Sequence, residues 1–175
     1  LGDVVCIDAK AGEKNWSVST ADKFGAKLGR WGGAESLIIE DNKVICTPGG
    51  DKASLVALDK NNGNTIWITK DLSDKNAYCS GILIDRGNKK IVVTAVEKAV
   101  VGVDAENGNL LWKYDCEKYM GDVKIRGNHP NTPIYKDGQI YITSGYDMGG
   151  VKLKISDDGM EVSQLWSDKN LDTHH

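Results

Sequence analysis

The chain has 175 residues, with 22 basic and 25 acidic side chains, a formal net charge of −3 and a hydrophobic fraction of 40%. This is ordinary globular composition, and the charges form no blocks, which argues against nucleic acid or a polybasic membrane contact. No apolar run approaches the roughly 20 residues of a transmembrane helix. The chain opens at Leu1 without a signal-like segment, and we expect it to be a piece of a longer protein.

The first expected element is a hairpin within residues 1–18, where "VVCIDAKAGEKNWSV" reads as two strand-like runs around a turn. Three longer units follow. They begin with the hairpins "SLIIEDNKVICTPGG", "SGILIDRGNKKIVVTAV" and "TPIYKDGQIYITSGY". Each continues with a third run, "SLVALD", "AVVGVD" or "GVKLKI", and with a fourth run that ends at a tryptophan. Helical periodicity is scarce throughout, so we predict an all-β chain.

One short frame recurs in these units: Asp, then Gly four residues later, then Trp eight residues later. From Asp8 the frame recurs after 51, 45 and 51 residues, and in the last copy Ile155 replaces the Asp. Four strands at this period are typical of a β-propeller blade. We therefore predict a partial β-propeller of about three and a half four-stranded antiparallel blades. The expected boundaries in this single fragment are a half blade at 1–18, blades at about 34–70, 78–115 and 130–168, and the start of a further blade at 171–175.

The frame has a structural reading. The Asp can bond the backbone two residues on, the Gly accepts positive φ, and the Trp has a large face to bury between blades. In the last copy, seven residues rather than four separate Gly from Trp. Asn-Gly and Asp-Gly pairs at the hairpins predict tight type I′ turns. The predicted docking motif comprises Asp8, Gly12, Trp16, Asp59, Gly63, Trp67, Asp104, Gly108, Trp112, Gly159 and Trp166.

The segments "ALDKNNGNTIW" and "GVDAENGNLLW" resemble the tryptophan-docking motif of the PQQ-like (pyrroloquinoline quinone) propeller repeat family. The resemblance covers essentially the whole chain and implies an extracytoplasmic, periplasmic or secreted bacterial protein. It implies two functional branches: dehydrogenases that hold PQQ and calcium, and non-catalytic propellers such as the lipoprotein that assists β-barrel assembly. The motif is structural in both branches. Alcohol dehydrogenases of the family cover their quinone with a disulfide between adjacent cysteines, and no two cysteines are adjacent here.

The segments before each innermost strand should surround the mouth of the central channel. They carry polar and aromatic groups that a plain connection does not need, and we predict a binding surface there, with a charged anchor pair and a stacking platform. Its residues are Arg30, Trp31, Glu35, Tyr78, Asn128, His129, Asn131 and His174. The alternative is that Trp31 seals a blade junction, Glu35 caps a strand and His129 is a solvated loop residue. His129 and His174 have no carboxylates at a spacing typical of metal ligands, so the sequence predicts no metal site.

The leading functional hypothesis is a non-enzymatic scaffold that binds a protein or saccharide partner through these mouth loops, with no cofactor in this chain. One alternative is part of a PQQ- and calcium-dependent alcohol or sugar dehydrogenase; another is a purely structural repeat. A cut propeller exposes strand edges and interblade faces, so we also expect the fragment to self-associate. A monomer at micromolar concentration in light scattering would contradict that expectation.

Overall fold

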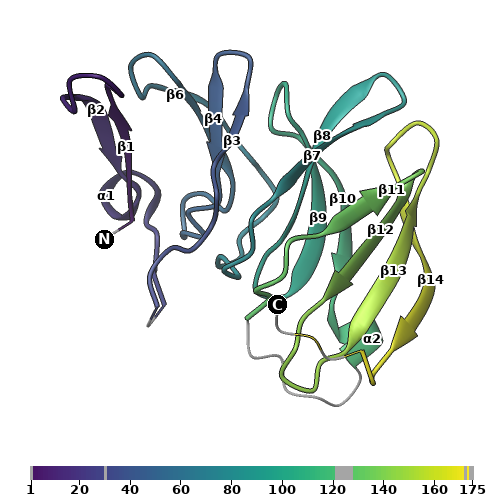
Figure 1. Ribbon diagram of the computed structural model, residues 1–175. Coiled ribbons are helices and arrows are strands. Elements are labelled where there is room, and N and C mark those ends of the chain that lie inside the picture. The colour runs from purple at the N-terminus through teal and green to yellow at the C-terminus, as the bar shows by residue number, and fades with distance from the viewer. Residues whose placement is uncertain (1, 30, 121–127, 172, 174–175) are drawn as a thin grey trace.

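The computed structural model describes residues 2–29, 31–120, 128–171 and 173. These residues form one two-stranded and three four-stranded antiparallel sheets, set side by side like the blades of a fan (Figure 1). The prediction of an all-β, partial β-propeller with about three and a half blades is therefore confirmed. No helix in this part of the chain is long and apolar enough to cross a membrane.

The N-terminal half blade pairs β1 (Asp3–Ile7) with β2 (Lys14–Ser19). A short helix, α1 (Thr20–Phe24), follows directly. Ser19 caps the start of the helix: its side chain accepts a hydrogen bond from the backbone N–H of Asp22, as N-cap residues do. It ends at Gly25, whose φ of 70° is the left-handed conformation that closes many helices.

Each full blade runs in chain order from one edge of its sheet to the other. Blade B consists of β3 (Ile38–Glu40), β4 (Lys43–Cys46), β5 (Val56–Asp59) and β6 (Thr65–Ile68). Blade C consists of β7 (Ile82–Arg86), β8 (Lys89–Ala95), β9 (Ala99–Asp104) and β10 (Leu110–Asp115), after which comes α2 (Glu117–Met120). Blade D consists of β11 (Ile134–Lys136), β12 (Gln139–Thr143), β13 (Gly150–Ile155) and β14 (Val162–Asp168).

The hydrophobic core lies between the blades as three separate clusters, one at each junction. All six residues of β9 are buried, because blade C has a neighbour on both faces. In β13 of blade D, by contrast, buried Val151 and Leu153 alternate with Lys152 and Lys154. Blade burial thus follows the number of neighbours, as expected for a repeat array in which each unit contacts only adjacent units.

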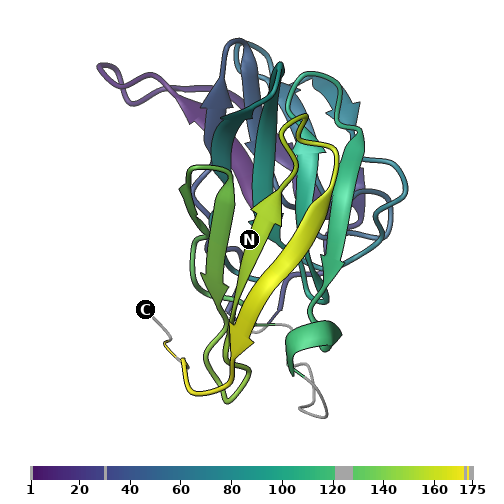
Figure 2. The ribbon, with the colours of Figure 1, turned by 90° about the vertical axis from the view of Figure 1, so that its right-hand side faces the viewer.

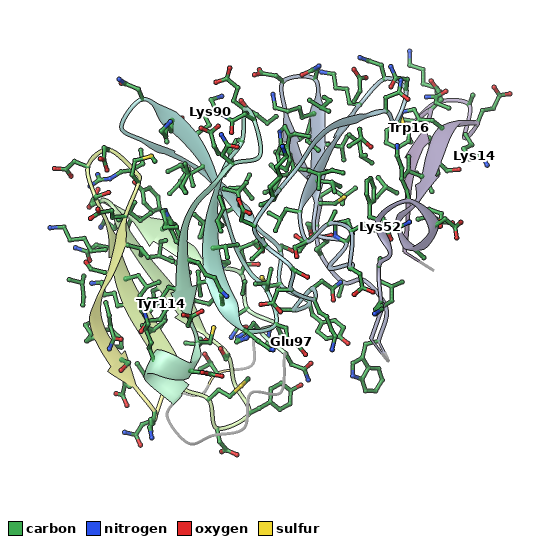
Figure 3. The ribbon with its side chains drawn as sticks, turned by 180° about the vertical axis from the view of Figure 1, so that it is seen from behind. Lys14, Trp16, Lys52, Lys90, Glu97 and Tyr114 are labelled. Carbon is green, nitrogen blue, oxygen red and sulfur yellow. The ribbon has the colours of Figure 1, made fainter. Side chains whose placement is uncertain are left out.

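At the first two junctions, a tryptophan of one blade lies on the turn of the next. The ring of Trp16 packs over Gly63, and its indole N–H donates to the carbonyl of Lys60 over 2.9 Å. Figure 3 shows Trp16 on the side of the half blade toward blade B. Trp67 repeats the arrangement over Gly108, with its indole N–H 3.2 Å from the carbonyl of Ala105.

The third junction differs. The equivalent carbonyl belongs to Ser156, and it accepts a hydrogen bond from Nε of Arg86 over 2.9 Å rather than from a tryptophan. Trp112 packs against Gly102 of its own blade, and its buried indole N–H has no acceptor among the described residues. Gly159 lies against Ile91 instead of an indole. The altered last copy of the motif, without its Asp and with a longer fourth run, is thus accompanied by a different docking side chain.

The aspartates of the first three copies organise their turns through local hydrogen bonds. Oδ1 of Asp8, Asp59 and Asp104 each accepts from the backbone N–H two residues later. The prediction of type I′ turns was wrong at most sites. Of the predicted Asn-Gly and Asp-Gly pairs, only Asp137–Gly138 has both residues at positive φ, 49° and 76°. The other motif turns are longer. The N–H of Asp59 bonds the carbonyl of Asn64, which leaves four residues in the turn instead of two, and only the glycine is left-handed.

Candidate functional site

In each full blade, the residue three positions before the first strand makes a hydrogen bond to the end of the second strand. Oε1 of Glu35 accepts from the N–H of Thr47 over 2.7 Å, just after β4. At the equivalent place in blade C, Sγ of Cys79 accepts from the N–H of Ala95 over 3.2 Å. In blade D, Nδ2 of Asn131 donates to Oγ1 of Thr143 over 2.6 Å. A carboxylate, a thiol and an amide thus perform one task, which is to join the start of the first strand to the end of the second.

Glu35 differs from its two counterparts because it also faces a hollow of about 360 Å³ between the half blade and blade B. Acidic, amide and hydroxyl groups line the hollow together with aliphatic side chains. They come from β1, from the start of α1, from the connection between α1 and β3, from the end of β4 and from the segment before blade C. The main lining residues are Asp3, Val5, Thr20, Leu28, Glu35, Leu37, Cys46 and Asn76.

The environment of the hollow favours neutral side chains. Burial raises the pKa of the Glu35 carboxyl above its ordinary value, and the hydrogen bonds from Thr47 only partly oppose this shift. Burial, and secondarily the Glu35 carboxylate, raise the pKa of the Cys46 thiol. A reactive thiolate needs the opposite shift. Cys46 is therefore a poor nucleophile.

Tyr78 lies against the loop that precedes Glu35. Its backbone φ is 70°, a left-handed conformation that bulky residues adopt rarely. Its hydroxyl occupies the space where a side chain at Gly29 would begin. The N–H of Ser36 also donates to Oγ of Ser80 over 2.8 Å. The structure therefore brings together the Glu35 and Tyr78 segments of the predicted surface, and Trp31, 70% exposed, lies on the same loop.

His129 is not at the surface, which corrects both its predicted place in a binding surface and the alternative of a solvated loop residue. It is fully buried, with Nδ1 2.7 Å from Oγ of Ser144 and Nε2 3.1 Å from the carbonyl of Glu97. Its backbone N–H bonds the carbonyl of Ala77. The residue therefore ties blade C to blade D.

This burial predicts a pH effect. Burial lowers the pKa of His129 below its ordinary 6.5. As the pH falls below that value, the unfolded chain binds a proton that the folded ring resists, so stability is present above 6.5 and lost below it. We expect the free energy of unfolding, relative to that of His129→Gln, to fall by up to about 1.4 kcal/mol per pH unit. Urea unfolding between about pH 7 and pH 5 measures this difference. Parallel pH curves for the two proteins would contradict the assignment.

The other predicted surface residues are only partly placed. Asn128 is half-buried beside His129. Nδ2 of Asn131 also donates to the carbonyl of Thr173 over 2.6 Å, so the amide is tied to the C-terminal segment. Arg30 and His174 lie outside the described residues. The sequence interpretation missed Asn76 and Leu28. Asn76 lies only two residues before Tyr78, but only the fold shows that it faces the same space as Glu35.

A family model described as "Outer membrane protein assembly factor BamB" matches residues 2–172. The chain belongs to this PQQ-like repeat family. Among solved structures, a europium-containing methanol dehydrogenase is similar, with a TM-score of 0.53 and 12% sequence identity over 91% of this chain. The match spans 37% of that dehydrogenase chain, and at this identity it shows the fold alone. No curated protein matches the sequence significantly.

Membership of the PQQ-like family raises the question of a quinone and a metal. In the described ranges, no three His, Cys, Asp or Glu side chains are placed together so that they could hold a metal ion. No disulfide joins the four cysteines. Glu35, the carboxylate that lines the hollow between the half blade and blade B, accepts a hydrogen bond from the N–H of Thr47. Burial raises its pKa and so favours its neutral form. These residues do not fit a calcium site, which needs several charged or carbonyl oxygens around one point.

Proposed function

We propose that this chain forms part of a non-enzymatic PQQ-like propeller scaffold that binds a protein or saccharide partner at the channel mouth. The observation that carries the proposal is the hollow beside Glu35, with its mixed lining of hydrogen-bonding and aliphatic side chains. Ligand sites combine an apolar lining with a few convergent polar groups. Trp31 on the adjoining loop offers an exposed aromatic surface, which suits a sugar ring or a protein side chain.

A quinoprotein dehydrogenase is the second candidate, because the resemblance to the PQQ-like repeat family implies a dehydrogenase branch as well as a non-catalytic one. In that case the PQQ and calcium ligands would come from residues outside the described ones. A purely structural repeat is the third candidate. For the scaffold we further propose an extracytoplasmic location, periplasmic or secreted, which the family membership supports.

The test compares the wild-type chain with a triple variant, Arg30→Ala, Trp31→Ala and Glu35→Gln. Glutamine at position 35 retains an acceptor for the N–H of Thr47, so the blade should stay closed. Lys154→Ala, on the open face of blade D, is the control. Against a panel of immobilised glycans and outer-membrane peptides, we expect the triple variant alone to lose binding.

Equal binding by all three proteins would contradict a site at the mouth. A parallel titration with PQQ and calcium tests the dehydrogenase candidate. It is followed by tryptophan fluorescence and by dye reduction with alcohols and sugars. Saturable quenching together with dye reduction would favour the dehydrogenase over the scaffold. If neither partner nor quinone binds, the purely structural repeat is favoured.

Self-association remains a proposal, and two surfaces support it. β1 pairs only with β2 among the described strands, and its residues Val5 and Ile7 are 43% and 57% exposed. At the other end, blade D leaves one face uncovered (Figure 2). There the ring of Trp166 contacts Tyr141 at 5.7 Å between centroids and is 39% exposed. Both faces would be covered if two copies packed head to tail.

A further inference from the structure

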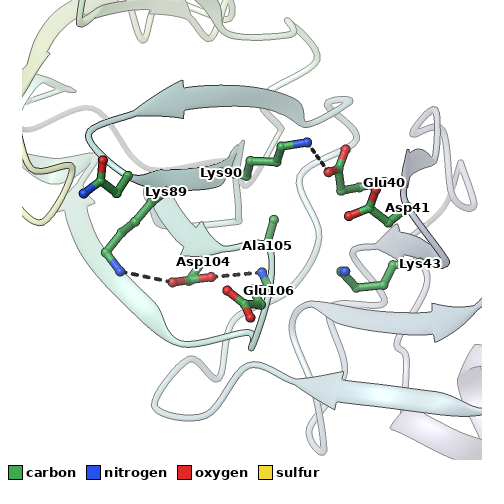
Figure 4. A pocket seen from close by; sticks show the side chains of 9 residues that line it. Glu40, Asp41, Lys43, Lys89, Lys90, Asp104, Ala105 and Glu106 are labelled. Atoms are coloured by element: carbon green, nitrogen blue, oxygen red, sulfur yellow. Dashed lines mark hydrogen bonds and ion pairs between the residues drawn. The ribbon is translucent and has the colours of Figure 1, made fainter.

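Three of the four copies of the Asp-Gly-Trp frame form the same turn. These turns begin at Asp8, Asp59 and Asp104. In chain order, the N–H of the Asp bonds the carbonyl five residues later over 2.8, 2.7 and 2.9 Å, and the N–H of the Gly bonds the carbonyl of the Asp. Figure 4 shows part of the third turn, where Asp104 also accepts from the N–H of Glu106. The glycines have φ of 71°, 75° and 78°, so the three turns share one backbone geometry.

Two of these turns hold a tryptophan of the preceding blade, and the first turn holds none among the described residues. We call the motif glycine and the carbonyl after the motif Asp the tryptophan seat, since the ring packs on one and the indole N–H donates to the other. Gly63 and Gly108 are buried beneath their rings. Gly12, in the first turn, is exposed, and a Cβ there would meet no atom within 4 Å. Its seat, completed by the carbonyl of Ala9, is therefore formed but empty.

The opposite end of the fan carries a tryptophan without a seat (Figure 1). Trp166 follows the register shift of its strand pair, the position that the other three motif tryptophans hold in theirs. It pairs with Lys152, which lies between Val151 and Leu153 of the cluster that joins blades C and D. Because side chains alternate along a strand, Trp166 faces away from blade C. It is 39% exposed, against 7% for Trp67, and its indole N–H donates to no described residue.

We propose that Trp166 of one copy docks on the Gly12 seat of a second copy, so that two chains close a ring head to tail. The inference rests on the self-association proposed above and adds the contact that joins the copies. Its model is the junction inside the chain where Trp16 occupies the seat at Gly63. Two copies of four sheets each bring eight blades together, within the range of about four to eight blades found in propellers. A head-to-tail contact whose rotation closes gives a finite ring.

Exposed apolar side chains surround both halves of the proposed contact. On blade D, Ile134 is 64% exposed and pairs with Tyr141, whose ring contacts that of Trp166. On the half blade, Val5 and Ile7 of β1 lead into the empty turn and are exposed. A small ligand would leave most of these side chains in water, whereas a second copy would cover them together with the indole ring. The copy that supplies the tryptophan thus completes a blade junction of the copy that supplies the turn.

The experiment measures self-association of the full chain by sedimentation velocity between about 1 and 100 µM. We expect a dimer that grows no further as the concentration rises. Trp166→Ala should weaken dimerisation by about a hundredfold or more, because both junctions of the ring lose a buried aromatic anchor. Gly12→Leu, which fills the seat, should weaken it by a similar factor. Trp31→Ala, the control, removes an exposed tryptophan from the connection between α1 and β3 and should have no effect.

A mixture of the two variants tests the head-to-tail geometry. Each variant retains the half of the contact that the other lacks. An equimolar mixture should therefore dimerise at least about tenfold more tightly than either variant alone, through one intact contact. A contact between two blade D faces would instead leave Gly12→Leu unaffected and give no gain on mixing.

Circular dichroism of each variant at high dilution shows whether a loss of association reflects loss of the fold. At that dilution the seat is empty, so a substitution at Gly12 acts on the backbone alone. With a dimeric wild type, undiminished dimerisation of either variant, or no gain on mixing, would overturn the Trp166 contact and leave self-association in place. Growth of the wild type into longer species would contradict a closed ring. A wild-type monomer over the whole range would overturn self-association itself.

Discussion

Replacing Trp67 with alanine is expected to lower the free energy of unfolding by about 3–5 kcal/mol, because a large buried ring is lost from the junction of blades B and C. The ring is 7% exposed and packs over Gly108. Its N–H bonds the carbonyl of Ala105, so even Trp67→Phe should lose about 0.5–1.5 kcal/mol from that hydrogen bond, in addition to packing.

Trp112 is the matched control. It is about as buried as Trp67, but its N–H has no acceptor among the described residues. The carbonyl of Ser156, which corresponds to that of Ala105, accepts from Nε of Arg86 instead. Removing an unpaired buried donor recovers a desolvation cost of about 1–3 kcal/mol. We therefore expect Trp112→Phe to be clearly less destabilising than Trp67→Phe. Urea unfolding followed by circular dichroism measures both, since fluorescence changes with the mutation itself. Equal losses would show that the two junctions are alike.

The second large effect is expected at the glycine beneath the ring. Gly108→Ala should destabilise the protein by about 2–4 kcal/mol, through backbone strain and overpacking together. Gly108 has φ of 78°, and a Cβ there would lie 2.5 Å from Cε3 of Trp67. The strand pair on either side of the turn cannot move away without opening the blade junction.

A substitution at Gly12 distinguishes backbone strain from overpacking. It holds the same motif position at φ of 71°, but an added Cβ there meets no atom within 4 Å. Gly12→Ala should therefore show the backbone cost alone, about 1 kcal/mol. The excess for Gly108→Ala, measured by the same urea unfolding, reports the interblade contact. If the two variants lose the same amount, the tryptophan does not rest on the glycine in solution.

Some of the site could be predicted from sequence and some could not. The loop around Glu35 and the Tyr78 segment were predicted to share a surface, and Ser36 and Ser80 do bond each other there. The sequence pattern could not show that His129 is buried, because its partners, Ser144 and Glu97, come from different blades.

The sequence by itself determined the repeat. Strand alternation, turn glycines and the recurring Asp-Gly-Trp frame act within a few residues, so they define four-stranded blades without reference to the rest of the fold. Only the tertiary structure decided which side chains meet between blades. Trp16 reaches Lys60, 44 residues away, whereas at the last junction Arg86 reaches Ser156, 70 residues away, and replaces the tryptophan. Such contacts depend on how two separately formed sheets pack against each other.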